Sequence, residues 1–196
     1  TIFTTVIDSI NYQFVTVAEH TAQTVNGVLT FSNIPIYEGT YVTNRYTVDT
    51  NNVDQKFYVN DANGDTTTLI VDVFDNSSST LSTTFTQALD TTQVKTNSNV
   101  YFLQESVDGK FEVYFGDGIT GKALSDGNIV RLRYVVTNKA KANGASSFST
   151  SATISTITDI TTATVSNASG GAERESIQSI KFNAPLDYAA QGRAVT

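Results

Sequence analysis

The chain has 196 residues, of which 39% are hydrophobic and 16% are charged, and its formal net charge is −7. This length can bury one sizeable hydrophobic core or two small ones. The negative charge repels phosphate backbones and argues against non-specific nucleic-acid binding. The lack of cysteine excludes disulfides and thiolate metal sites. No apolar run approaches the roughly eighteen residues that a membrane-spanning helix needs, so we expect no membrane partner.

Threonine, valine, tyrosine and phenylalanine dominate the sequence, and these residues suit the half-buried surface of a pleated sheet. The strands expected in chain order are Thr1–Ile7, Ile10–Val17, Gly27–Phe31, Thr40–Val48, Gln55–Val59, Thr66–Phe74, Val100–Glu105, Lys110–Phe115, Asn128–Thr137 and Ser147–Ile154. Turn signals recur at roughly 8 to 12 residues, a spacing typical of an antiparallel sandwich or barrel. The predicted fold is therefore mainly β, sandwich-like or barrel-like, followed by a short C-terminal α-helix.

Two features organise the region after residue 100. Asp108 and Gly109 separate two strand-like runs, and such a dipeptide supplies the backbone angles of a tight hairpin. Along residues 128–136, apolar side chains alternate with Arg131 and Arg133, which is the pattern of a strand with one buried face. We expect both arginines to point to water or to a partner. Together with Lys139 and Lys141 they predict a solvated basic rim, since stacking aromatics are scarce there.

Residues 77–93 interrupt the β pattern. Leu81, Phe85 and Leu89 are spaced four apart, as on one face of a short helix. Threonine is a poor helix former, so a flexible linker between two β units is the alternative.

The C-terminal part follows a repetitive Ser/Thr/Ile segment. Acidic residues after Gly171, Lys181 near the end and Pro185 beyond it predict a helix over residues 172–183. Ile177 and Ile180 share one face, and we interpret Ile177, Ile180 and Lys181 as a partner-contact surface. The predicted organisation has four parts: a β subdomain at 1–95, a hairpin-rich part of the same or a second β subdomain at 96–150, a Ser/Thr-rich linker at 151–170 and a helical segment at 171–196.

Residues 116–121 imitate two nucleotide-binding loops. Gly116, Gly118 and Gly121 match G-x-G-x-x-G, and Lys122 completes a P-loop-like spacing. Both motifs need a helix that starts at the glycines and directs its amides at phosphate, whereas residues 122–128 lead into another turn and a strand. We therefore interpret these glycines, like Gly109, as turn glycines in a connection between antiparallel strands, and we expect no cofactor.

Other signals for chemistry are weak. Residues Asp61–Asp65 resemble the start of a calcium loop, but the glycine falls fourth where the sixth position is required. A hairpin turn is the preferred interpretation, and cation binding stays open. His20 is the single histidine and is expected at the surface or partly packed. No catalytic, cofactor-binding or metal-ligating residue is predicted, and we do not expect an enzyme.

Two sequence blocks carry a family resemblance. The first is FGDG-x-x-GK-x-L-x-x-GN at Phe115–Asn128, within the stretch Ser98–Ala145, and the second is GG-x-E-x-ES-x-x-x-IK-x-x-AP at Gly170–Pro185, within Gly170–Thr196. In order and spacing they resemble the baseplate wedge protein of contractile-tailed bacteriophages, the large J-like wedge component. Members of that family are longer, which implies that this chain is an internal portion.

The resemblance implies a structural protein of the virion, located in the phage tail baseplate and made as a late protein in the host cytoplasm. It implies other baseplate wedge proteins as partners, and a homodimer or ring-forming homo-oligomer. From the residues we add the hypothesis that the segment from Ser149 onward makes intersubunit contacts, since its apolar residues are few. The alternative is a receptor- or glycan-binding β module of a tail or cell-surface protein, for which the nine tyrosines could supply sugar platforms.

Overall fold

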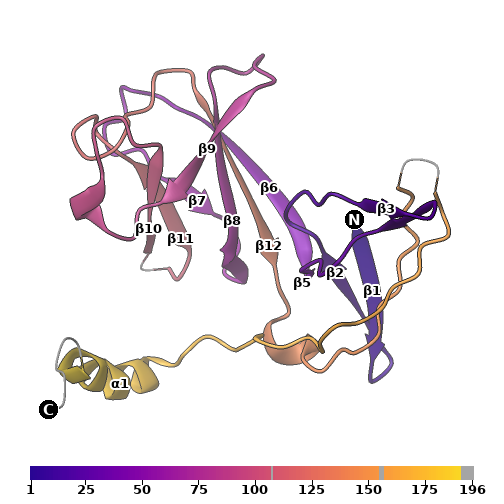
Figure 1. Cartoon of the computed structure of the whole chain (residues 1–196). Helices are drawn as coiled ribbons and strands as arrows, with labels where there is room; N and C mark the ends of the chain where they lie inside the picture. Colours follow the sequence, from indigo (N-terminus) through magenta and orange to yellow (C-terminus); the bar gives the residue numbers. More distant parts are fainter. Residues whose placement is uncertain (107, 155–156, 191–196) are drawn as a thin grey trace, which may run out of the picture.

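The computed structural model describes residues 1–106, 108–154 and 157–190 (Figure 1). Its strands are β1 (Ile2–Ile7), β2 (Ile10–Val15), β3 (Gln23–Val25), β4 (Val28–Thr30), β5 (Tyr37–Glu38), β6 (Thr40–Thr47), β7 (Phe57–Val59), β8 (Gly64–Phe74), β9 (Ser82–Gln87), β10 (Val100–Glu105), β11 (Phe111–Phe115) and β12 (Ile129–Val136). The helical elements are two 3-10 turns, η1 (Thr91–Gln93) and η2 (Lys139–Ala142), and the helix α1 (Ile177–Ala190). The predicted β class with a C-terminal helix is confirmed.

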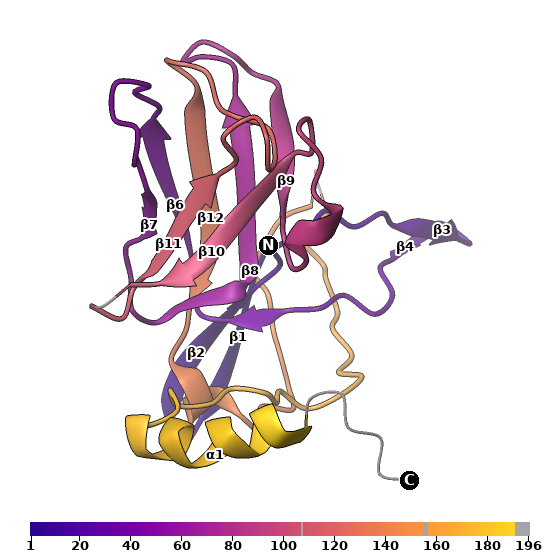
Figure 2. The ribbon, with the colours of Figure 1, turned by 90° about the vertical axis from the view of Figure 1, so that its left-hand side faces the viewer.

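The largest sheet has seven strands in the order β6-β12-β8-β9-β10-β11-β7 and curls into a nearly closed barrel. It combines strands from both sides of residue 95, the predicted end of the first β subdomain. The four-part domain organisation stays a prediction. A three-stranded sheet, β1-β2-β5, forms a second unit, and the hairpin β3-β4 projects from the body in Figure 2.

The barrel encloses one hydrophobic core. Strand β12 is central, because it pairs antiparallel with both β6 and β8. Its residues Val130, Leu132 and Tyr134 are at most 1% exposed, which is the inward face that the alternation predicts. The rings of Phe57 and Phe85 both meet Phe115 edge-on, with centroids 5.5 and 5.3 Å apart, an arrangement that aromatic pairs prefer.

Side chains join the two edge strands where the barrel lacks a backbone ladder. The hydroxyl of Tyr46 on β6 donates a hydrogen bond to the carbonyl of Tyr58 on β7 at 2.6 Å. Asn60 donates to the same hydroxyl at 3.0 Å, and the ring of Tyr46 packs edge-on against Phe57. These contacts cover unpaired strand edges, which would otherwise be open to another chain.

The second unit has its own small core beside the barrel. Tyr12 and Phe14 are buried there with Ala142 and Ala145 from the segment around η2. Phe148 closes the cluster, with its ring centroid 4.9 Å from that of Phe14. The chain after β12 therefore returns to complete the N-terminal sheet.

A glycine forms the joint between the two units. Gly39 separates β5 from β6, has a φ of +126°, and leaves no room for a Cβ atom against the carbonyl of Val136. The neighbouring Glu38 accepts hydrogen bonds from the backbone and side chain of Asn138, at 2.7 and 2.6 Å. Only glycine combines this φ with such a close backbone approach.

Two predicted segments differ from the structure. Residues 82–87 form strand β9, neither a helix nor a linker, because β-branched threonines suit a strand and Phe85 packs into the barrel core. Leu81 and Leu89 stay 85% and 89% exposed, so their four-residue spacing marks no helical face. The strand predicted at 147–154 is also wrong, since only isolated bridges form there, among them Ser149 with Thr4.

A bulge in β8 depends on one hydroxyl. The register between β8 and β12 shifts between Arg133 and Val135. At this point the buried backbone N–H of Val135 donates to the Oγ1 atom of Thr68 at 2.9 Å, and that hydroxyl donates to the carbonyl of Asp65 at 2.7 Å. The side chain thus replaces a ladder carbonyl, as buried backbone groups require a partner.

We expect Thr68→Val to lower the free energy of unfolding by about 1–3 kcal/mol, since an isosteric methyl leaves the Val135 N–H buried without an acceptor. Urea unfolding monitored by tyrosine fluorescence measures the change. Thr68→Ser keeps the hydroxyl and serves as the matched control. Equal stability of the valine and serine variants would contradict this role of Thr68.

Candidate functional site

The segment before α1 is fastened to the body by polar contacts. Arg174 forms an ion pair with Glu105 at 2.9 Å, donates to the carbonyl of Gly109 at 2.7 Å and lies over the ring of Phe111. Further back, Lys139 pairs with Glu173 at 2.9 Å, and the side chain of Asn143 exchanges two hydrogen bonds with the backbone of Gly171. These contacts hold residues 171–174 against the body in a non-helical conformation.

The helix consequently begins later than predicted. Ser176 caps it, because its hydroxyl accepts the backbone N–H of Ser179 at 3.1 Å. Hydrogen bonds from Ser179 and Asn183 hold the carboxylate of Glu175 and lower its pKa. The predicted end at residue 183 is wrong as well, since Pro185 lies inside the helix. Proline costs the helix one backbone hydrogen bond, but its fixed φ is compatible with a helical path. Residues 191–196, part of the predicted helical segment, lie outside the described residues, as do 107 and 155–156.

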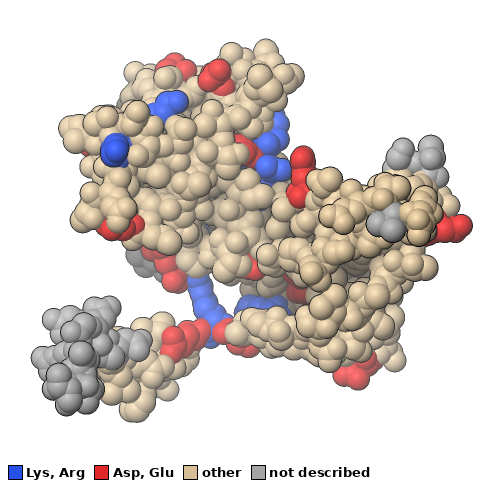
Figure 3. All heavy atoms as spheres, viewed as in Figure 1, with Lys and Arg blue, Asp and Glu red and all other residues tan. Residues whose placement is uncertain are grey.

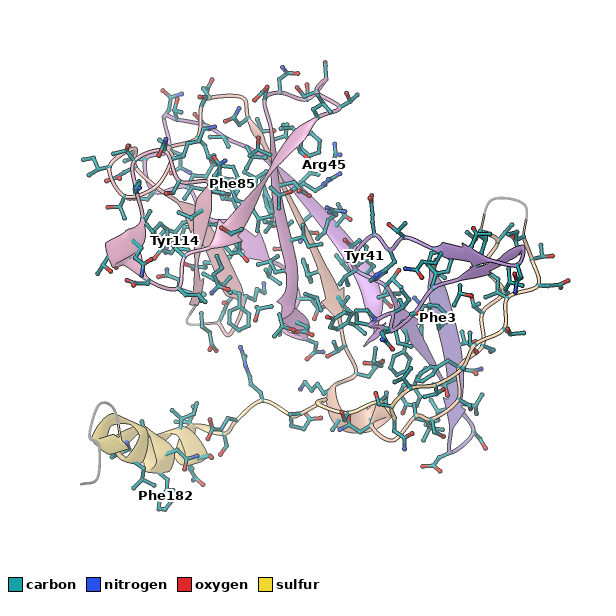
Figure 4. The ribbon with its side chains drawn as sticks, in the orientation of Figure 1. Phe3, Tyr41, Arg45, Phe85, Tyr114 and Phe182 are labelled. Atoms are coloured by element: carbon teal, nitrogen blue, oxygen red, sulfur yellow. The ribbon has the colours of Figure 1, made fainter. Side chains whose placement is uncertain are left out.

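Helix α1 exposes large apolar side chains. Ile177, Ile180, Phe182 and Leu186 are 71%, 48%, 74% and 58% exposed. At about 100° per residue, Ile177 and Ile180 lie on one side of the helix, and Phe182 and Leu186 lie close to the opposite side. Lys181, the third predicted contact residue, is also exposed. Figure 4 shows Phe182 directed away from the two β units. Apolar groups on opposite sides of one helix require cover on both sides.

The glycine loop after β11 has a structural explanation. Gly118 and Gly121 have φ values of +85° and +88°, and at Gly116 a Cβ atom would meet the backbone of residues 120–121. Asp117 closes the loop by accepting the N–H groups of Ile119 and Thr120, both at 2.9 Å, and these bonds lower its pKa. The loop joins β11 to β12, which are not neighbours in the sheet, and residues 122–128 form no helix that could direct amides at a phosphate.

In the calcium-like loop at Asp61–Asp65, the carboxylates accept hydrogen bonds from neighbouring residues of the chain. Asp61 accepts the N–H of Asn63 at 2.8 Å, and Asp65 accepts the N–H and hydroxyl of Thr67 at 2.9 and 2.7 Å. The loop is not the expected hairpin turn, because β7 and β8 are not paired. Across residues 1–106, 108–154 and 157–190, no three histidine or acidic side chains come together as metal ligands.

His20 lies between β2 and β3, and within the described part of the chain its Nε2 atom has no hydrogen-bond partner.

None of the helices in the described part of the chain combines the length and apolarity needed to cross a membrane.

The outer face of β8 and β12 holds a buried ionic cluster that the sequence did not predict. Asp72 is only 2% exposed, and its Oδ2 atom accepts N–H groups from Arg131 and Arg133, the shortest at 2.9 and 2.8 Å. Thr84 donates to the other oxygen at 2.8 Å. Burial opposes ionisation of Asp72, but the hydrogen bonds of Thr84 and Arg131 with the charge of Arg133 outweigh it and lower the pKa.

The arginines therefore converge on a carboxylate that the sequence did not predict, while 22% of the Arg131 side chain and 29% of the Arg133 side chain stay exposed to solvent. The missing information was the strand register, which places Asp72 opposite Arg131. The predicted basic rim is also divided, because Lys139 pairs with Glu173 at the other end of β12.

A second ionic group lies on the outer face of β10 and β11. Glu112 accepts the Nζ of Lys56 at 2.7 Å and the Nε2 of Gln104 at 2.8 Å. These bonds, led by that of Lys56, lower the pKa of Glu112 to about 2. Beside them Phe102 and Tyr114 stack on each other with centroids 5.2 Å apart, so the two rings use their faces for mutual packing.

The low pKa of Glu112 predicts an acid-sensitive contribution to folding. A carboxylate whose pKa falls from 4.5 to about 2 on folding stabilises the protein above pH 4.5, and this contribution is lost as the pH falls toward 2. In urea unfolding across this range, Glu112→Gln should show a shallower decline in stability than the unchanged chain. Glu19→Gln is the control, because Glu19 is exposed and forms no ion pair with the other described residues. Identical pH profiles for Glu112→Gln and the unchanged chain would refute the assignment.

Two comparisons with known proteins indicate the family of the chain. A model of the family described as "Bacteriophage baseplate wedge protein gp6, third domain" matches residues 45–145, which include the end of β6 and all of β7 to β12. The chain is also 30% identical over 121 residues to baseplate wedge protein gp6 of Enterobacteria phage T4, with 50% of this chain covered. It spans 18% of the length of that relative. By the extent of the family match, this chain belongs to the bacteriophage baseplate wedge protein gp6 family.

Proposed function

We propose that the chain is a structural module of a phage tail baseplate wedge, and that helix α1 makes contacts between subunits in the baseplate ring. The observation that carries this proposal is the exposure of apolar side chains on two sides of α1. Family membership supports a role in the baseplate and a location in the virion. Synthesis in the host cytoplasm is part of the proposal. The partners proposed are other baseplate wedge proteins, within a homodimer or a ring-forming homo-oligomer.

The energetics of α1 support a covering partner. An isolated helix of 14 residues is only marginally stable in water, because its few hydrogen bonds barely offset the cost of nucleation. Burying one isoleucine, leucine or phenylalanine side chain contributes about 1.5–3 kcal/mol. Covering Ile180 and Phe182 alone would therefore stabilise the helix substantially, and their opposite orientations suit a position between two neighbouring surfaces.

The contact region that we propose is α1 alone, which is narrower than the whole segment from Ser149 onward. Phe148 and Ala168 pack against the core of the N-terminal unit, and Ser149 bridges Thr4 through two backbone hydrogen bonds of 2.8 and 2.9 Å. These residues serve the chain itself. The contacts of Arg174 and Lys139 hold the segment that leads into α1 against the body.

Ile180→Glu and Phe182→Glu test the two sides of α1 separately. Each change places a charge in an interface that should be apolar, so we expect each to weaken assembly by at least about tenfold. The measurement is sedimentation of the protein, carrying each change, with the other wedge proteins of its phage. Gln178→Glu adds the same charge at a polar position of the helix and should assemble normally.

Circular dichroism of each variant shows whether the β units remain folded. Normal assembly of both Ile180→Glu and Phe182→Glu would overturn the proposed contact. Loss with one variant alone would restrict the contact to that side of α1, and would contradict the two-sided arrangement.

A further inference from the structure

A donor-rich arginine surface lies on the outer face of β6, β12 and β8. Arg131 and Arg133 each direct two N–H groups at a single oxygen of Asp72, with distances between 2.8 and 3.3 Å. A guanidinium has five N–H donors, and a carboxylate oxygen offers about two lone pairs. The two arginines therefore have more donors than Asp72 can satisfy, and they reach solvent with 22% and 29% of their side chains exposed.

A third arginine extends the same surface. The backbone register places Arg45 on β6 directly opposite Arg131. The guanidinium groups of both residues lie over the ring of Phe74, at 5.3 and 4.7 Å from its centroid. This packing orients Arg45, and among the described residues it has no ion pair. Two arginines thus pair with one carboxylate and a third lies beside Arg131. These four side chains carry an excess of two positive charges on a chain of net charge −7.

We infer that Arg45, Arg131 and Arg133 form a binding surface for the carboxylate side chains of an acidic polypeptide segment from a partner. Asp72 holds two of the guanidinium groups in fixed orientations, so less side-chain entropy is lost when a second carboxylate binds. The planar fork of arginine matches a carboxylate through paired hydrogen bonds. This inference is independent of helix α1.

The setting favours a polypeptide segment over a nucleic acid. Figure 3 shows basic side chains gathered beside β6, and in Figure 4 Arg45 points outward from the barrel. A recess of about 460 Å³ continues from Arg133 along Tyr41 toward the N-terminal unit. Glu19 also lines this recess and would repel any anion that extends along it, so the surface suits a ligand whose few negative groups stay on the arginines. A short acidic segment needs only the three arginines.

The test is a titration of the 15N-labelled chain with acetylated, amidated hexaglutamate, followed through the Nε–H signals of its arginines by NMR. Hexaglutamine, inorganic phosphate and a single-stranded DNA hexamer are compared at equal ionic strength. We expect saturable shifts of Arg45, Arg131 and Arg133 with hexaglutamate and none with hexaglutamine. Arg45→Gln should weaken binding about tenfold, as loss of a hydrogen bond to a charged group does.

Arg45→Gln is chosen because Arg45 lies outside the Asp72 ion pairs, so the variant should keep its fold. Lys95→Gln removes one charge from an exposed position far along the chain and should bind as the unchanged protein does. Equal weakening by both substitutions, or shifts of the same size with phosphate, would reduce the effect to general charge attraction and overturn the inference. Tighter binding of the DNA hexamer, or no shift with hexaglutamate, would also overturn it.

Discussion

The buried carboxylate of Asp72 is the constraint on which the barrel depends. A buried charge without a partner is strongly destabilising, so β8 and β12 must pair in the register that brings Arg131 and Arg133 to Asp72. A slip by one residue would exchange the two faces of β12. The same register that neutralises Asp72 thus directs Leu132 and Tyr134 into the core.

Strand β12 is connected both to the N-terminal unit and to the segment that precedes α1. Its last residue, Val136, lies against Gly39 at the joint between the two units, and η2 follows directly. From η2, the contacts of Lys139 and Asn143 fix the segment that precedes α1. A continuous path of backbone pairing and ion pairs therefore links the barrel core to the start of an uncovered helix. Such a path gives a structural protein a defined geometry for its contacts.

Local patterns predicted most strands but few of the relationships between them. The alternation along β12 and the turn at Gly109 depend on near neighbours, and both elements formed where expected. Strand β9 was missed because Phe85 is fixed by the barrel core, a long-range effect that a four-residue spacing cannot show. The ionic cluster was missed because Asp72 and Arg131 are distant in sequence. The helix start shifted because Arg174 binds Glu105 and Gly109, again over a long separation.

The two proposed partner surfaces differ in how well their side chains are ordered before a partner binds. Arg131 and Arg133 are held by Asp72, so a ligand there finds donors already oriented and loses little entropy on binding. Among residues 177–186 of α1, whose side chains are described, no ion pair gives comparable support. A partner that covers Ile180 and Phe182 must therefore also stabilise the helix itself. The arginine surface should therefore recognise an acidic segment with specificity but modest affinity. The helix can contribute more affinity, because apolar burial on two sides stabilises more than an exposed ion pair does.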